Sequence, residues 1–232
     1  MGKIEPLFGM EYAQEDGLPK FGTDALLLAD FCPPAENAAD LGCGQGIIAL
    51  LLSRSCGRVT GIELDPAAAA VAAGNAARNG LEGRVRIVCG DLRDPACLPP
   101  PGSLELIACN PPYFASAAGA VSPDPARAAA RTEGECTLPD VLRAARRCLA
   151  FRGRLCFLWR PERLTEAAAA AEAEGFALKR LRAVHQRADR PAMLLLCEAR
   201  KGARPGLCIE PPLILQEADG SPTAEYRRIY QI

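Results

Sequence analysis

The sequence predicts an α/β protein with a seven-stranded, mostly parallel sheet and helices on both faces. Two observations predict this fold class. From residue 37 onward, short apolar runs alternate with stretches of helical spacing. The runs at 84–89 and 103–109 are apolar enough to be buried on two faces, as parallel strands are. Strands that alternate with helices connect through right-handed crossovers, and this gives a mostly parallel sheet.

The elements follow in order along the chain. We expect strands at residues 37–41, 58–64, 84–89, 103–109, 154–159, 176–184 and 191–199. We expect helices at residues 21–29, 47–55, 65–79, 138–149 and 161–174. Asp65 and Pro66 form a helix start, with an N-cap acid before a proline at the first helical position. We divide the chain into an N-terminal helical cap segment, residues 1–36, and one larger domain, residues 37–232.

Composition narrows the class of protein. The 232 residues suffice for one buried core, and 24% charged residues argue against global disorder. The 11 cysteines form no C-x-x-C pair, so we expect small buried thiols in a reducing compartment, with neither a disulfide framework nor a metal site. No apolar run reaches membrane-spanning length and no signal-peptide core precedes the domain, so we expect a cytoplasmic protein.

A glycine-rich turn follows the first strand of the large domain. Asp40, Gly42, Gly44 and Gly46 stand in this turn, and Glu63 follows 17 positions later at the end of the second strand. Glycines let the backbone approach a ligand, and a carboxylate at the second strand end can accept two ribose hydroxyls. The G-x-G-x-G spacing differs from the dinucleotide pattern. The sequence therefore predicts a nucleoside-binding edge.

A polar tetrad, Asn110-Pro111-Pro112-Tyr113, follows the fourth strand. The Asn110 side-chain oxygen and the Pro111 carbonyl are two acceptors that can hold the two N–H bonds of an amino or amide nitrogen. Pro111 and Pro112 fix the backbone, and Tyr113 offers a face on which a base can stack. Alone, the tetrad could be a Pro-Pro turn with a packed tyrosine; beside the glycine turn, an amine-acceptor site is the better interpretation.

The glycine turn resembles the S-adenosylmethionine loop of class I methyltransferases, which have a Rossmann-like fold. This resemblance implies S-adenosylmethionine as cofactor, with Asp40 at its amino-acid end and Glu63 at its ribose. It also implies that Asp91, after the third strand, contacts the adenine amine. The tetrad resembles the Asn/Asp-Pro-Pro-Tyr/Phe motif of N-methyltransferases that act on adenine, guanine or glutamine, with Asn110 also near the cofactor.

A narrower resemblance covers nearly the whole chain. Residues 21–29, 184–192, 198–202, 211–215 and 223–230 look like bacterial tRNA1(Val) adenine-37 N(6)-methyltransferases. The departure is Gln186, where that group leads us to expect proline. The resemblance implies methylation of an adenine next to the anticodon of a tRNA, by a protein that we expect to be monomeric. Thr23, in the first of these stretches, is a further candidate for the cofactor site.

The substrate-binding candidates lie mostly in the C-terminal half. Residues 1–115 carry 8 basic and 14 acidic side chains, whereas residues 116–232 carry 19 and 14, which hints at a polyanionic partner. A solvated surface is the alternative interpretation. The candidates that we expect to contact RNA are Tyr113, Arg127, Arg131, His185, Arg187 and Lys201. His185, the single histidine, has a packing role as its alternative.

Three other functions remain open. A protein glutamine amide offers the same two N–H groups to the tetrad, although such enzymes usually carry a separate N-terminal helical domain. A base of ribosomal RNA is another acceptor of this type. A non-catalytic S-adenosylmethionine-binding subunit is a hypothesis of a different class, and the intact Asn110 argues against it.

Overall fold

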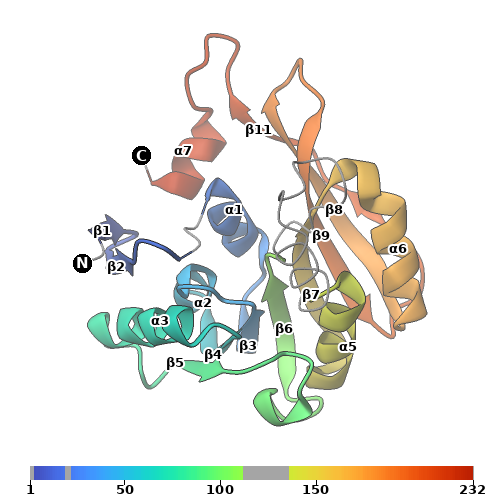
Figure 1. Cartoon of the computed structure of the whole chain (residues 1–232). Helices are drawn as coiled ribbons and strands as arrows, with labels where there is room; N and C mark the ends of the chain where they lie inside the picture. Colours follow the sequence, from blue (N-terminus) through green and yellow to red (C-terminus); the bar gives the residue numbers. More distant parts are fainter. Residues whose placement is uncertain (1–2, 19–21, 112–135, 232) are drawn as a thin grey trace, which may run out of the picture.

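The computed structural model describes residues 3–18, 22–111 and 136–231 of the chain (Figure 1). The seven predicted strands are all present and belong to one sheet of nine. They are β3 (Ala35–Leu41), β4 (Cys56–Glu63), β5 (Val85–Cys89), β6 (Leu104–Cys109), β7 (Leu149–Trp159), β8 (Phe176–Arg187) and β9 (Ala192–Lys201). Two short strands that were not expected, β10 (Cys208–Ile209) and β11 (Leu213–Gln216), extend the sheet beside β8.

The sheet is mostly parallel, as predicted. Its order is β10-β8-β9-β7-β6-β3-β4-β5, with β11 also paired to β8, and β9 runs antiparallel to both of its neighbours. The chain first proceeds from β3 outward to β5 and then returns to place β6 on the other side of β3. This reversal makes the carboxyl ends of β3 and β6 a topological switch point, where open α/β sheets bind their ligands.

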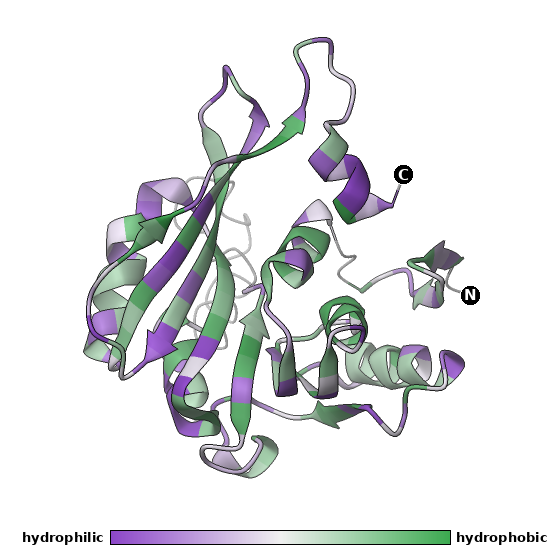
Figure 2. Cartoon of the chain, turned by 180° about the vertical axis from the view of Figure 1, so that it is seen from behind, coloured by the Kyte–Doolittle hydropathy of each residue, from purple (hydrophilic) through white to green (hydrophobic). Residues whose placement is uncertain are grey.

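Helices cover both faces of the sheet (Figure 1). One face carries α1 (Thr23–Phe31), α2 (Ile47–Leu52) and α3 (Pro66–Arg78), and the other carries α5 (Leu138–Cys148) and α6 (Leu164–Ala173). Strand β6 alternates between the two cores: Leu106 and Ala108 pack on the α1 side, and Ile107 and Cys109 on the α5 side. Figure 2 shows the apolar strands between these helix layers from behind.

The predicted helices are confirmed, and their first and last residues differ slightly from those expected. The Asp65 carboxylate accepts from Ala67 N–H at 2.8 Å and starts α3 as the sequence indicates. The predicted helix at 161–174 is a 3-10 turn (Pro161–Arg163) followed by α6. A short helix near the C-terminus, α7 (Ala224–Tyr230), was not predicted, and it packs against α1 and β11. The helix of the N-terminal cap segment is α1.

A β-hairpin precedes α1 and was not expected. It consists of β1 (Lys3–Leu7) and β2 (Met10–Gln14), and it pairs with no strand of the large sheet. The division at residue 36 stays a prediction. Within the N-terminal segment that we expected to be helical, the described residues form this hairpin and one helix, α1.

Two asparagines, Asn75 in α3 and Asn79 at the C-cap of this helix, fasten the hairpin to the domain. The Asn75 side chain accepts from Ala13 N–H at 2.8 Å and donates to the Ala13 carbonyl at 3.0 Å. The Asn79 side chain does the same for Glu11, at 2.9 and 2.8 Å. Residues four apart on a helix lie on one face, as do residues two apart on a strand, so the two side chains imitate a strand partner for β2.

The cysteines are free thiols, and seven of the 11 are buried, as expected. Cys89 is an exception: the sequence places it in an apolar run, but the structure exposes it at the end of the edge strand β5. No helix in the described part of the chain is both long and apolar enough to span a bilayer.

Candidate methyl-transfer site at the carboxyl edge of the sheet

The predicted motifs meet at the switch point of the sheet. In the strand register, Asp40 of β3 lies opposite Gly61 of β4 and Ala108 of β6. Gly42 and Asn110, each two residues further on, are therefore level on neighbouring strands. Backbone hydrogen bonds continue past the strand ends, from Gly42 N–H to the Ile62 carbonyl at 2.9 Å. The glycine turn, Glu63 and Asn110 thus share one edge.

The glycine turn depends on a backbone that other residues rarely adopt. Gly42, Gly44 and Gly46 have φ values of 72°, 54° and 93°. Gly46 also lies against α3, because a Cβ atom added there would come within 2.9 Å of the Ala72 Cβ. Gly46 is the N-cap of α2, so this contact fixes how closely the turn approaches α3. The sequence pattern therefore reflects both a left-handed turn and tight packing.

Asp40 is fully buried beneath this turn. Its Oδ2 accepts from Ala49 N–H at 3.1 Å, whereas its Oδ1 has no hydrogen-bond partner among the described residues. Burial raises the pKa of Asp40 to about 7, and the charge of Glu63 adds to this, while the Ala49 N–H acts against it. A buried carboxylate with an unsatisfied oxygen fits a cationic ligand group, such as the ammonium of an amino-acid moiety.

Glu63 is held in place by two backbone donors. Gly44 N–H donates to its Oε2 at 2.7 Å, and Asp65 N–H donates to its Oε1 at 2.9 Å. Each carboxylate oxygen can accept a second hydrogen bond, so the oriented group retains capacity for a diol. Glu63 therefore has a structural role that the sequence did not reveal: it ties the glycine turn to the end of β4.

Asn110 follows β6 at the centre of the edge. Its side-chain oxygen is buried and lacks a hydrogen-bond partner within the described part of the chain, and Pro111 beside it is buried. An acceptor left unsatisfied in this way fits the N–H of a ligand. Pro112, Tyr113, Arg127 and Arg131 lie outside the described residues.

Asp91 follows the end of β5. Cys89, two residues before it, is the register partner of Glu63 at the end of β4. Its carboxylate binds the Arg93 guanidinium through Nε at 3.0 Å and Nη2 at 2.7 Å. This hydrogen-bonded partner lowers the pKa of Asp91. The structure thus places Asp91 on the predicted edge, with an arginine that keeps it ionised.

The β1–β2 hairpin packs against the glycine turn and supports it. The sequence analysis did not predict this contact. Tyr12 is buried beside Asp40 and Cys43, and its hydroxyl contacts the backbone of Ile47; burial raises its pKa. The Gln45 side chain accepts from Glu15 N–H at 2.8 Å. The available signal was a pair of asparagines four apart in an otherwise alanine-rich helix.

The substrate candidates separate into two groups. His185 and Arg187 lie at the end of β8, which is parallel to β7 and therefore ends at the site edge. Lys201 ends the antiparallel β9, so it lies at the opposite edge, where its Nζ donates to the Leu149 carbonyl at 2.6 Å. The structure does not bring Lys201 to the other candidates.

His185 forms a structural hydrogen bond of the kind that a packing role requires, and its contact with RNA stays a prediction. Its Nδ1–H donates to the Arg190 carbonyl at 2.7 Å and closes the turn between β8 and β9. Arg187 forms an ion pair with Asp189 at 3.0 Å, at the tip of the same hairpin.

Part of the positive charge that the sequence places in residues 116–232 is used inside the protein. Arg180 and Arg200 share the buried Glu198 at 3.1 and 2.7 Å, and Arg182 pairs with Glu225 at 2.8 Å. These side chains stabilise the β8–β9 half of the sheet and contribute less free charge than the sequence count indicates.

Thr23 starts α1, and it lines a pocket with residues of β8, β9, β11 and α7. Its predicted contact with the cofactor stays a prediction. Among the described residues, no group of three or more His, Cys, Asp or Glu side chains is arranged to hold a metal ion.

Comparisons with known proteins identify the family of this chain. A family model, the methyltransferase small domain, matches residues 20–172. A tRNA1(Val) (adenine(37)-N6)-methyltransferase of Tolumonas auensis is 32% identical over 213 residues, which cover 89% of this chain and 86% of that protein. A protein of the same name from Aeromonas salmonicida is 38% identical over 60% of this chain and 58% of its own length.

Solved structures show the same fold. The crystal structure of a predicted O-methyltransferase from Agrobacterium tumefaciens has a TM-score of 0.71 at 22% identity, and it covers 90% of this chain and 95% of that one. TYW2 of P. horikoshii, in complex with MeSAdo, has a TM-score of 0.60 at 14% identity and covers 87% and 72%. The fold, the site geometry and the family match lead to one assignment: the chain belongs to the methyltransferase small domain family and is an S-adenosylmethionine-dependent methyltransferase.

Proposed function

We propose that this protein methylates N6 of an adenine in tRNA, at position 37 next to the anticodon. The observation that carries the proposal is the buried, unsatisfied oxygen of Asn110 at the switch point, level with the glycine turn. The names of the relatives supply the substrate, because they are tRNA adenine-N6 methyltransferases at 32% identity over most of the chain. The target base leaves the anticodon loop to reach this edge.

The residues of the site hold the cofactor from two sides. Asp40 accepts from the ammonium of its amino-acid end, Glu63 from its ribose hydroxyls and Asp91 from its adenine amine. The bound cofactor supplies an electrophilic methyl group on a sulfonium. Thr23, at the start of α1, is a further contact in this proposal.

Catalysis by this chain is orientation. The adenine N6 is a weak nucleophile because its lone pair is delocalised into the ring. The Asn110 oxygen and the Pro111 carbonyl accept its two N–H bonds and favour a pyramidal nitrogen with the lone pair aimed at the methyl carbon. The bound cofactor would supply the methyl group to the lone pair that Asn110 and Pro111 orient, with its C–S bond broken as the N–C bond forms, and the displaced N6 proton would pass to water. No general base is needed, so positioning accounts for the rate.

The remaining features of the proposal concern the substrate. Tyr113 stacks on the flipped adenine, Arg127, Arg131 and Arg187 contact phosphates, and His185 shapes the hairpin beside them. The protein acts as a monomer in the cytoplasm, where its tRNA resides.

The test is methyl transfer from labelled S-adenosylmethionine to total tRNA from a strain that lacks the gene, followed by nucleoside analysis. Label in N6-methyladenosine, mapped to position 37, is the expected result. Label in ribosomal RNA or in a protein glutamine instead keeps the chemistry and overturns the substrate.

Asn110→Ala is the matched variant for this assay. Removal of one of two orienting acceptors lowers kcat at least about 100-fold, in line with the loss of a positioned group. Cofactor affinity, measured by calorimetry, stays within about threefold because the other contacts remain. Full activity of this variant contradicts the mechanism, whatever the substrate is.

A further inference from the structure

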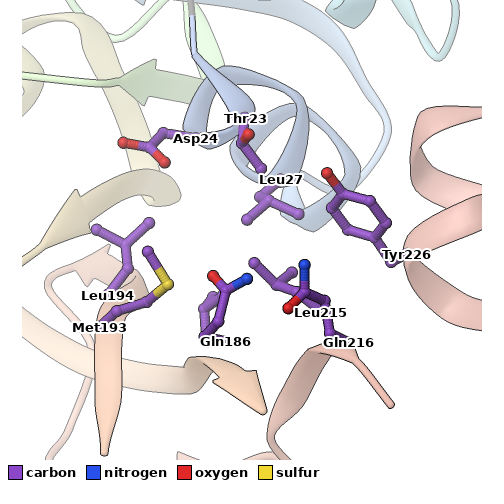
Figure 3. A pocket seen from close by; sticks show the side chains of 10 residues that line it. Thr23, Asp24, Leu27, Gln186, Met193, Leu194, Leu215, Gln216 and Tyr226 are labelled. Atoms are coloured by element: carbon purple, nitrogen blue, oxygen red, sulfur yellow. The ribbon is translucent and has the colours of Figure 1, made fainter. Parts of the chain in front are cut away.

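A small pocket opens on the substrate side of the edge, between α1, the β8–β9 hairpin, β11 and α7 (Figure 3). Its volume is about 240 Å³. That is below the roughly 300 Å³ at which pockets for drug-sized ligands begin, so it fits one planar ring system. Its floor is apolar and comes from buried leucines. These are Leu27, Leu194 and Leu215.

Two glutamine side chains point into this pocket from neighbouring strands (Figure 3). Gln186 is near the end of β8, and Gln216 lies opposite Arg187 in the β11 register. Neither carboxamide forms a side-chain hydrogen bond with any residue that the structure describes. Met193 is 44% exposed at the rim and adds a polarisable thioether.

The walls of the pocket are fixed before any ligand binds. The Arg228 guanidinium joins α7 to Asp30 of α1 through bonds of 2.7 and 2.9 Å. Arg182 and Glu225 join α7 to β8 at 2.9 and 2.8 Å. Tyr226 forms one wall, and its ring is stacked on a second tyrosine of α7 at a centroid distance of 4.4 Å. A preorganised pocket loses little entropy on binding.

The chemistry of the lining selects an uncharged, hydrogen-bonding ring. Among the described residues that line the pocket, the charged one is Asp24, an acid, and no lysine or arginine is present. A phosphate would therefore find no cation there. Each glutamine carboxamide offers a donor and an acceptor side by side, which is the pattern that matches the edge of a nucleobase. Aromatic and thioether groups suit its faces.

The position of the pocket excludes the methylated base itself. Across the sheet, β8 is three strands from β6, and the β8–β9 hairpin projects about four residues beyond the level of Asn110. With strands about 4.8 Å apart and about 3.3 Å per residue, the backbone of Gln186 lies roughly 20 Å from Asn110, and that of Leu194, the lining residue on β9, roughly 12 Å. Of the cofactor candidates, Asp40, Glu63 and Asp91 lie on the other side of Asn110, whereas Thr23 lines the pocket at the start of α1.

We propose that this pocket binds an unpaired base of the substrate RNA, a few nucleotides from the adenine that is methylated. Gln186 and Gln216 read the edge of that base, and Tyr226 and Met193 contact its rings. This inference rests on the proposed function, because it needs an RNA substrate. It adds a subsite that sets sequence preference without taking part in methyl transfer.

The experiment uses the full chain with saturating S-adenosylmethionine and anticodon stem-loop RNAs. The RNAs share the target adenine and differ in the identity of one loop base at a time. The measured quantity is kcat/KM for each RNA, with wild type, Gln186→Leu and Gln216→Leu. Leucine keeps the size of the side chain and removes its hydrogen bonds. Ala188→Leu is the control, because Ala188 is exposed in the turn of the hairpin and does not line the pocket.

We expect wild type to prefer one base at one loop position. Each glutamine variant loses about tenfold in kcat/KM on the preferred RNA and little on the others, as expected when a bidentate base contact is removed. Ala188→Leu keeps the wild-type preference. Thermal unfolding and the cofactor dissociation constant are measured for every variant, and neither changes.

Four outcomes overturn the inference. An unchanged base preference in both glutamine variants shows that the pocket reads no base. A weaker cofactor affinity places the pocket in the cofactor site. If isolated nucleosides inhibit wild type and not the variants, the ligand is a free nucleoside and not a base of the RNA. Absence of methylation on any RNA, with Asn110-dependent methylation of another substrate, refutes the proposed function and this inference with it.

Discussion

The two halves of the carboxyl edge are built by different means. The half formed by β3, β4 and β5 consists of backbone: three glycines in left-handed conformations, and the Glu63 carboxylate bonded to two N–H groups. The half formed by β8, β9, β11 and α7 consists of side chains joined by ion pairs such as Arg182 with Glu225. In our proposal, the cofactor meets a glycine turn and carboxylates that backbone N–H groups hold in place, whereas the substrate meets side chains that are joined by ion pairs. We therefore expect substitutions to cost most on the first half.

The largest effect is expected for Gly46→Ala. The new Cβ lies within 2.9 Å of the Ala72 Cβ, at a φ of 93°. We expect the free energy of unfolding to fall by about 2–4 kcal/mol, from overpacking and backbone strain together. Cofactor binding is lost in parallel. Urea denaturation and calorimetry measure the two quantities.

Gly74→Ala is the matched control for that substitution. Gly74 lies inside α3, and a Cβ there meets no atom within 4 Å. Alanine is the better helix former, so this variant gains up to about 1 kcal/mol of stability. Equal destabilisation by both variants would mean that the closeness of Gly46 to α3 is not the reason for glycine.

Asp40→Asn separates stability from binding. The pKa of Asp40 is raised from its ordinary 3.8 to about 7, so the folded state binds this proton more tightly than the unfolded state. Its ionisation therefore lowers wild-type stability as the pH rises from about 4 to 7, and stability stays lower above that range. At pH 8 we expect Asp40→Asn to be more stable than wild type without ligand, yet to bind the cofactor about 100-fold more weakly.

The pH dependence of binding provides the check. Wild-type affinity falls as the pH drops below about 7, since a protonated Asp40 cannot pair with an ammonium group. The affinity of Asp40→Asn shows no such step. A variant that binds as tightly as wild type at pH 8 contradicts the assignment of Asp40 to the amino-acid end. Calorimetry between about pH 5.5 and pH 8, at about half-unit steps, resolves how the cofactor dissociation constant changes with pH.

Glu63→Gln tests the carboxylate at the end of β4, in the same half of the edge. The amide keeps one oxygen for the Gly44 N–H and replaces the other by a donor, which then faces Asp65 N–H. We expect about tenfold weaker cofactor binding, near the value of a charge-assisted hydrogen bond. Glu63→Ala should bind more weakly still, because it also frees the glycine turn. An unchanged dissociation constant in both variants rules out the ribose contact.

The smallest effect is expected in the substrate half of the edge. Two basic residues, Arg187 and Lys201, are compared there. Arg187 lies at the site edge and Lys201 at the opposite edge. We expect Arg187→Ala to weaken RNA binding about threefold at low salt and to reduce its salt dependence by roughly one phosphate contact. Lys201→Ala leaves RNA affinity unchanged. Filter binding over a salt series distinguishes them, and the reverse ranking would mean that the RNA crosses the other edge.

The cofactor half could be predicted from the sequence because each of its signals is local. A glycine turn lies between a strand and the helix that follows it, and Glu63, Asp91 and Asn110 each stand directly at a strand end. Parallel strands bring all their carboxyl ends to one edge, so alternation of elements was enough to group them. His185 and Arg187, which the sequence analysis named as candidates for RNA contact, also lie at that edge in the structure.

The substrate half could not be predicted in the same way. The sequence counts Arg180, Arg200 and Lys201 with the basic residues, but the antiparallel β9 carries its last residues to the far edge. Strand direction is decided by pairing in the sheet and leaves no mark on local periodicity. Likewise, ion pairs such as Arg180 with Glu198 depend on residues 18 positions apart meeting across two strands.

The sequence by itself determined the fold class and the position of the glycine turn, Glu63 and Asn110 at strand ends, because these follow from short-range patterns of apolar, glycine and proline residues. The tertiary structure decided how the hairpin braces Asp40, which charges remain for RNA, and where Gln186 and Gln216 meet Tyr226. Those arrangements join segments up to 68 residues apart in the case of the hairpin, and more for α7 and α1. Only packing of the whole chain brings such segments together.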